Sequence, residues 1–303
     1  MPTRSNVLGI AAMVAAMLGF VSNDALVKLA SESMPLGETL FIRGFSSTAI
    51  VVALWIALRP RPKPADFKNR ALLLRTFGDV AATFVYLTAL TQLPIANATI
   101  VLQVVPLVVT LAGALLFREH VGWRRWTAIF VGLAGVIIVI RPGLSGFNAY
   151  SLLALAAVFL VALRDVATRG VPATIPSVAI VAAAVVANFA AAGVLGLTED
   201  WVWPHGDAIW LALGSGIAIV AAYWLIVIAL RVGHLSVTAP FRYTVVVWAV
   251  LYGIVVWDDR LDALTIVGAV LIVGSGVFTL YRERKLALAR KRAGATGDIS
   301  GGI

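Results

Sequence analysis

The chain has 303 residues, of which 61% are hydrophobic and only 13% are charged. A soluble domain carries about 25% charged residues, so this composition excludes a water-soluble protein and indicates a membrane protein. The net charge of +9 is spread over loops and the C-terminus rather than one helix, which argues against nucleic acid as a partner. The absence of cysteine excludes disulfides, thiolate metal sites and cysteine nucleophiles.

Ten apolar stretches follow one another along the chain, each close to the roughly 20 residues that a membrane-spanning helix needs. They cover residues 6–30, 36–58, 71–91, 95–117, 124–141, 149–169, 175–196, 207–230, 236–256 and 262–281. Turns rich in proline and glycine separate them. The first stretch is too long for a cleavable signal peptide, so we expect it to be retained. The sequence therefore predicts an all-α integral membrane fold with ten transmembrane helices.

Lysine and arginine are distributed unequally between the two sides of the predicted membrane. One side has most of them: the N-terminus, the loops near residues 59–70 and 118–125, and the region after Tyr281. The other side has the acids Glu199, Asp200, Asp207, Asp258, Asp259 and Asp262. Because basic loops stay inside, this asymmetry places both termini in the cytoplasm. The basic, then glycine-rich residues 284–303 are predicted to form a disordered tail.

Two halves of the chain repeat each other at an offset of about 140 residues. Asp165 and Arg169 recur after Asp24 and Lys28 at this spacing, each pair in the first helix of its half. The two predicted units are residues 1–145 and 146–283, with five helices each. An odd number of helices per unit inverts the second unit in the membrane. Inverted repeats are typical of secondary transporters, which bind substrate near the midplane between the halves.

Several motifs resemble a known family. Ala89-Leu90, Pro94-Ile95-Ala96-Asn97-Ala98, Pro106, Arg118-Glu119 and the Gly132/Gly135 span are similar to the drug/metabolite transporter (DMT) superfamily, EamA type. Asn23-Asp24-Ala25-Leu26-Val27-Lys28 with Phe41-Ile42-Arg43 resembles the branch that takes up S-adenosylmethionine or riboflavin. The second half departs from this pattern, with Asp258-Asp259 at the position of Arg118-Glu119 and Val246 at the position of Pro106.

The resemblance implies a permease of the bacterial inner (cytoplasmic) membrane that needs no cofactor. It also implies a central cavity lined by the first, third, fourth, sixth, eighth and ninth helices, with the fifth and tenth at the periphery. The candidates for lining this cavity are the polar and aromatic side chains within the spans. These are Asn23, Asp24, Asp79, Thr83, Tyr86, Asn97, Gln103, Arg164, Asp165, Tyr223, Trp224, Arg242 and Tyr243.

Charged residues within the spans allow two interpretations. A charge in hydrocarbon costs at least ~2.5 kcal/mol, so each must face protein or a wet cavity. Some of them bind substrate or take up a proton, or they form structural ion pairs that hold helices together. Lys28, one turn after Asp24, is placed to neutralise it. We assign Lys28, Arg43 and Arg169 to gating or structural pairs. Asp79 has only Arg75 as a cation one turn away.

Adjacent residues on a helix point about 100° apart, so Arg164 and Asp165 are not expected to face each other. Arg242 either clamps a substrate carboxylate or phosphate, or pairs with Asp165. Gln103 and Tyr243 occupy matching positions of the two halves and are expected on opposite walls of one cavity. Tyr86, Tyr223 and Trp224 are candidates for stacking on a planar or cationic substrate, with ordinary packing as the alternative.

No metal-ligand cluster, phosphate-binding loop or nucleophile motif is present, and no histidine lies deep in a span. A proton relay would therefore use the carboxylates, and proton coupling stays open. Glycines in the spans 124–141 and 262–281 allow close helix packing, either within a monomer or in a homodimer.

We expect a secondary transporter that works by alternating access and moves a small polar or amphipathic metabolite, such as an amino acid derivative, S-adenosylmethionine or a vitamin. An exporter of amino acids or cationic drugs is the alternative within this fold. A lipid flippase or a channel are alternatives of other classes. The acidic run at residues 258–262 resembles the magnesium motif of membrane prenyltransferases, but such a site needs a second cluster. We therefore predict that the protein is not an enzyme.

Overall fold

The computed structural model describes residues 4–59, 62–116, 122–142, 148–202, 206–232 and 235–297. These residues form helices and connecting turns, and no strand occurs among them. The helices are α1 Arg4–Ala30, α2 Leu36–Leu58, η1 Pro64–Lys68, α3 Arg70–Gln92, α4 Ile95–Leu102, α5 Val105–Leu116, α6 Trp123–Ile140, α7 Tyr150–Arg169, α8 Ser177–Gly196, α9 Ala208–Val232, α10 Leu235–Thr238, η2 Ala239–Tyr243, α11 Thr244–Trp257 and α12 Ala263–Gly297.

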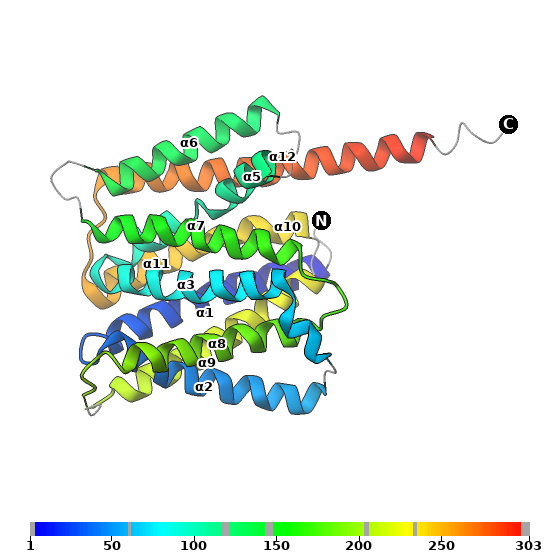
Figure 1. Cartoon of the computed structure of the whole chain (residues 1–303). Coiled ribbons are helices and arrows are strands. Elements are labelled where there is room, and N and C mark those ends of the chain that lie inside the picture. Colours follow the sequence, from blue (N-terminus) through cyan, green and yellow to red (C-terminus); the bar gives the residue numbers. More distant parts are fainter. Residues whose placement is uncertain are drawn as a thin grey trace.

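Within the described residues, 10 segments are long and apolar enough to cross a membrane. They agree with the ten predicted spans within a few residues, so the all-α integral membrane fold is confirmed. The long helices run side by side from one end of the molecule to the other (Figure 1). Their order in space differs from their order in the chain, because each half packs mainly against the other half.

Four contacts between helices of different halves organise the bundle. Helix α1 packs along α9, α3 along α7, α2 along α8, and α6 along α12. Figure 1 shows α6 and α12 at one edge of the molecule and α2 with α9 at the opposite edge. The peripheral position predicted for the fifth and tenth spans, which are α6 and α12, is therefore present in the structure.

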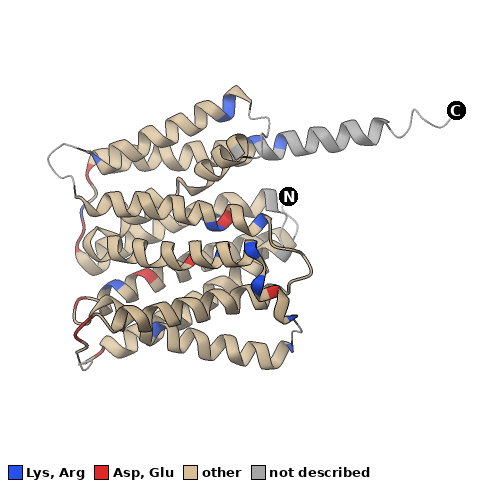
Figure 2. Ribbon diagram, viewed as in Figure 1, with Lys and Arg blue, Asp and Glu red and all other residues tan. Residues whose placement is uncertain are grey.

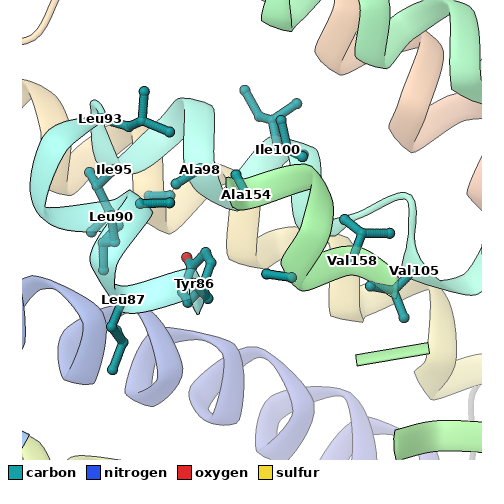
Figure 3. Close-up of a cluster of buried hydrophobic side chains, with 14 of the residues drawn as sticks. Tyr86, Leu87, Leu90, Leu93, Ile95, Ala98, Ile100, Val105, Ala154 and Val158 are labelled. Atoms are coloured by element: carbon teal, nitrogen blue, oxygen red, sulfur yellow. The ribbon is translucent and has the colours of Figure 1, made fainter. Parts of the chain in front are cut away.

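The largest hydrophobic cluster lies where α3, α4, α5 and α7 meet. Figure 3 shows Leu87, Leu90, Ile95, Ala154 and Val158 packed together, with the ring of Tyr86 beside them. These side chains are at most 2% exposed, apart from that of Tyr86 at 8%. The cluster fixes the position of α3, which contributes several of the polar residues described below.

Two spans that the sequence predicts as single helices are interrupted. The fourth span breaks at Gln103 and Val104 into α4 and α5, and the ninth breaks into α10, η2 and α11. Pro106 and Pro240 lie close to these breaks. A proline has no backbone N–H and its ring clashes with the carbonyl four residues earlier, which ends a regular helix. The breaks fall at matching positions of the two halves, a pattern that marks binding regions in transporters.

Glycines of the fifth and tenth spans serve contacts inside the protomer. A Cβ atom on Gly135 of α6 would lie 2.9 Å from the carbonyl oxygen of Gly268 in α12. A Cβ atom on Gly268 would lie equally close to the carbonyl oxygen of Gly135, at 2.8 Å. The backbones of α6 and α12 therefore approach too closely for side chains there. A homodimer through this helix pair stays a prediction.

Charges separate between the two ends of the bundle. Figure 2 shows acidic residues gathered in the loops at the left end and most of the lysines and arginines at the right, where α1 begins. Helix α12 continues to Gly297, past residue 284, where the sequence predicts the start of a disordered tail; disorder of residues 284–303 stays a prediction. Alanine and leucine favour helix there, and extending an existing helix avoids the cost of nucleation.

The acidic loop before α9 caps the start of α2. Pro35 precedes α2 and gives it no side-chain cap. The carboxylate of Glu199 accepts hydrogen bonds from the backbone N–H groups of Gly37, at 3.1 Å, and Glu38, at 3.3 Å. The buried Glu38 carboxylate in turn accepts one from the N–H of Val202, at 3.1 Å. An acid at a helix N-terminus is favourable because free N–H groups and the helix dipole both attract it.

Candidate functional site

A cavity of about 80 Å³, lined by both apolar and polar side chains, lies between helices α2, α3, α8 and α9. This volume holds several water-sized groups. Its polar and charged lining residues are Arg43 and Ser47 from α2, Arg75, Asp79 and Thr83 from α3, Asn188 from α8, and Tyr223 from α9. Two arginines and one aspartate thus face one small space. The helices come from both halves of the chain.

Asp79 is the centre of the contacts around this cavity. Its side chain accepts a hydrogen bond from Arg164 Nη1 of α7, at 3.2 Å, and another from Asn188 Nδ2 of α8, at 3.1 Å. The residue is only 7% exposed. A buried carboxylate needs such partners, because the loss of hydration is otherwise uncompensated. Asp79 therefore joins α3, α7 and α8 at the wall of the cavity.

Arg164 binds two carboxylates at once. Besides Asp79, it contacts Asp165 Oδ1 through Nε at 3.0 Å and through Nη2 at 2.9 Å. The expectation that Arg164 and Asp165 do not face each other is therefore wrong. The long arginine side chain folds back along its own helix and reaches the neighbouring carboxylate, while its other end spans to α3. The predicted alternative, a pair between Asp165 and Arg242, is not formed.

Asp24 belongs to a second polar group, between α1, α2 and α3. Tyr86 donates its hydroxyl to Asp24 Oδ2 at 3.0 Å, and Asn23 Nδ2 donates to Asp24 Oδ1 at 2.9 Å. Arg43 Nε donates to Asn23 Oδ1 at 2.9 Å, which links this group to the cavity that Arg43 lines. Asp24 and Arg43 thus lie on either side of one asparagine.

Lys28 does not neutralise Asp24. Its ammonium group donates to the backbone carbonyl of Leu90, at 3.1 Å, and to that of Leu93. It also lies 5.3 Å from the centre of the Trp257 ring. Carbonyls at the end of α3 attract a cation because they lack partners inside the helix. Lys28 therefore ties the end of α1 to the end of α3.

The acidic run at residues 258–262 has structural partners. Asp262 accepts hydrogen bonds from the N–H of Thr265, at 3.0 Å, and from Arg141. Burial alone would raise the pKa of Asp262, but these hydrogen bonds outweigh it and lower the pKa. Burial raises the pKa of Asp259, and the Lys28 ammonium opposes that rise. No group of three or more potential metal ligands occurs in the part of the chain that the structure describes.

Other predicted site residues lie away from the cavity. Gln103 donates to the carbonyl of Thr99 in its own helix, at 3.2 Å, and Tyr243 is buried against Gly276 of α12. They therefore do not form opposite walls of this cavity.

Four further predicted residues do not line the cavity either. Trp224 is 51% exposed on α9, and Arg242 is exposed. Arg169 is exposed at the end of α7, and Asn97 is half-buried in α4. Among the predicted aromatic residues, Tyr223 alone lines the cavity, with its ring edge-on to Phe20 at 5.2 Å.

The cavity also contains residues that the sequence did not single out. Ser47, Arg75 and Asn188 line it but were not among the predicted site residues. Helices α2 and α8 take part, although the family resemblance implies neither. Two signals were available: Arg75 precedes Asp79 by one turn, which places both on one face of α3, and Asn188 is the one amide in its span.

Comparisons with known proteins agree with this architecture. The model of the EamA-like transporter family matches residues 7–141 and again residues 148–281. A solved crystal structure superposes with a TM-score of 0.62 at 22% identity, covering 93% of this chain and 99% of that one. At this identity the match shows a common fold.

Three relatives with assigned functions align over nearly their whole length. A riboflavin transporter from Vibrio cholerae is 29% identical over 284 residues, which is 90% of this chain and 93% of that protein. An S-adenosylmethionine uptake transporter from Rickettsia prowazekii is 25% identical, covering 87% and 89%. A pseudopaline exporter from Pseudomonas aeruginosa is 27% identical, covering 91% and 97%.

The relatives are transporters of small metabolites, and none of these three is named as an enzyme. The family match covers well over half of the chain, and the ten spans occupy the matched segments. The prediction of a transporter rather than an enzyme is thereby confirmed. The chain is a multi-pass membrane protein that belongs to the EamA-like transporter family.

Proposed function

We propose that the protein is a secondary transporter that takes up a small polar metabolite across the bacterial inner membrane by alternating access. The cavity between the two halves carries this proposal, because its charged lining residues can meet a solute inside an apolar bundle. S-Adenosylmethionine and riboflavin are the first candidates, since two of the relatives carry these names.

An inverted repeat of residues 1–145 and 146–283 supports the alternating-access part of the proposal. If the first helix of each half corresponds, α1 matches α7 and α9 matches α3. The contacts of α1 with α9 and of α7 with α3 then form one symmetric pair. The contacts α2 with α8 and α6 with α12 each map onto themselves. Rocking of one half against the other is the motion that such repeats permit.

The carboxylates Asp24, Asp79 and Asp165 are the proposed residues for charge handling during transport. Each lies within a span, where an ionisable residue is by default a functional candidate. Each also has a cation or hydroxyl partner, so a proton or a substrate group can exchange for that partner as the cavity changes shape. Proton coupling through these residues is part of the proposal.

Transport into proteoliposomes tests this function. Purified protein is reconstituted, and uptake of radiolabelled S-adenosylmethionine and of riboflavin is followed with and without an inward proton gradient. We expect saturable uptake of one of them, stimulated by the gradient. Uptake no faster than in empty liposomes for both compounds contradicts the proposed substrates. If Asp24→Asn and Asp165→Asn both transport at the wild-type rate, the proposed charge-handling residues are wrong.

Export is the second candidate direction, because one relative is named as an exporter. Preloading the same proteoliposomes with the transported compound distinguishes the two. A carrier that exchanges in both directions shows counterflow, and the physiological direction then follows from the sign of the gradient that accelerates net movement.

A further inference from the structure

Two side chains of the cavity present buried polar atoms that have no partner within the described part of the chain. These atoms are Nε and Nη1 of Arg75 and Oδ1 of Asn188. Buried polar groups are nearly always paired, and leaving one unpaired costs about 1–3 kcal/mol. The residues that carry these atoms line the cavity, which is therefore prepared for a ligand that supplies the missing partners.

The orientation of Asn188 is determined by its hydrogen bonds. Its amide nitrogen donates to Asp79 Oδ2 at 3.1 Å and to the carbonyl of Ala184 at 2.9 Å. A primary amide has two N–H donors, and both are used here. The oxygen Oδ1 is thus the atom left over, and it is an acceptor. Reversing the amide would place an oxygen against the Asp79 carboxylate, which is repulsive.

The two residues that carry the unpaired atoms line the same cavity, and one offers donors whereas the other offers an acceptor. Arg75 offers N–H donors of a guanidinium group, which binds a carboxylate through two parallel hydrogen bonds. Asn188 Oδ1 offers an acceptor, and the Asp79 carboxylate lies beside it, one helical turn from Arg75. An ammonium group supplies donors to both of these acceptors. A doubly charged phosphate would instead meet the negative charge of Asp79.

We infer that this cavity binds the α-amino acid headgroup of the transported metabolite, with the carboxylate on Arg75 and the ammonium on Asn188 Oδ1 and Asp79. The inference rests on the proposed transport function. A volume of about 80 Å³ accommodates a headgroup and not a whole nucleoside, so the remainder of the metabolite occupies space that opens when the helices move. The proposed headgroup site favours S-adenosylmethionine over riboflavin, because riboflavin has no α-amino acid headgroup.

Equilibrium binding to the purified full-length protein tests the inference. The probes are S-adenosylmethionine, its decarboxylated form and riboflavin. For the wild type, we expect decarboxylation to weaken binding about 10- to 100-fold, since a charge-assisted bidentate contact is lost. Arg75→Gln should lower the affinity for S-adenosylmethionine to that of the decarboxylated form, and the affinity for the decarboxylated form should not change. Arg70→Gln is the matched control, because Arg70 is exposed at the start of the same helix.

Chromatographic and thermal measurements establish whether Arg75→Gln folds. If it does not, Arg75→Lys replaces it, because lysine retains the charge and loses the planar fork, and we expect the same loss of discrimination. Equal affinity of the wild type for both forms of S-adenosylmethionine overturns the headgroup site, as does exclusive binding of riboflavin, while transport itself stands.

If none of the three probes binds, the proposed substrates fail first. Free α-amino acids are then compared with their amides, and a preference of the wild type for the acids that Arg75→Gln lacks supports the headgroup site. Indifference to the carboxylate across that series shows that the unpaired atoms bind water only and overturns the inference.

Discussion

At the scale of single residues, Arg164 is unusual because it serves two carboxylates of unequal burial. Its side chain is 25% exposed, that of Asp79 is 10% exposed, and that of Asp165 is 35% exposed. Ion pairs gain strength as water is excluded, and exposed pairs contribute little. The contact with Asp79 should therefore carry more of the stability than the contact with Asp165.

Asp79→Asn should destabilise the protein more than Asp165→Asn. Removing one partner of a buried pair costs about 3–5 kcal/mol, and we expect about 2 kcal/mol here because Arg164 retains Asp165. Asp165→Asn should cost less than about 1 kcal/mol. Thermal unfolding of the two variants in the same detergent gives the order. Equal or reversed losses would show that Asp79 does not hold the three helices together.

Individual residues also show which parts of the cavity lining can be predicted from the sequence and which cannot. Asp79 was predictable as a cavity residue, because a charge inside a span must face a protected space, and Thr83 lies one turn further on the same face. Trp224 was predicted beside Tyr223, yet it is 51% exposed while Tyr223 lines the cavity. One residue turns a helix by about 100°, so the rotation of each helix decides which neighbour faces inward. That rotation depends on packing between distant helices.

At the scale of helices, composition and turn residues identify the ten spans. They do not identify the interrupted ones, because the apolar runs continue through Gln103 and through Pro240. The sequence also does not predict which helices pack against each other. For example, α2 packs on α8 from the other half. Helix α2 accordingly begins with an acceptor that comes from a distant loop, Glu199.

Replacing Glu199 with alanine should lower stability by about 1–2 kcal/mol. Two N–H groups in the first turn of α2 lose their acceptor, and a favourable charge at the helix N-terminus disappears. Asp200→Ala is the matched control, because this neighbouring acid is exposed. Melting temperatures of both variants check the expectation, which fails if the two changes have the same effect.

Gly135→Ala should destabilise the contact of α6 with α12. The added Cβ would lie 2.8 Å from Ile272 Cγ1 and 2.9 Å from the carbonyl oxygen of Gly268. Overpacking of this kind costs about 1–3 kcal/mol. Gly274→Ala in α12 meets nothing within 4 Å and should be neutral or slightly stabilising, since alanine favours helix. Comparing the melting temperatures of the two alanine variants tests whether packing inside the protomer uses these glycines.

At the scale of the whole molecule, the charge distribution predicts how the chain sits in the membrane. The loops at one end are acidic, and the other end contains most of the lysines and arginines (Figure 2). The basic end is expected in the cytoplasm. Fused after residue 303, green fluorescent protein should fluoresce and alkaline phosphatase should be inactive. The opposite result would reverse the predicted topology and the side from which the cavity is loaded.

The tether at Lys28 has a consequence for any motion of the halves. It fastens the tip of α1, which packs on α9, to the tip of α3, which packs on α7. The pair α1–α9 and the pair α3–α7 are therefore joined to each other at the acidic end of the bundle. If the halves rock as proposed, we expect the motion to pivot about this corner, because parting the helix tips there requires the ammonium to give up both backbone oxygens. We therefore expect the basic end of the bundle to open before the end that Lys28 holds together.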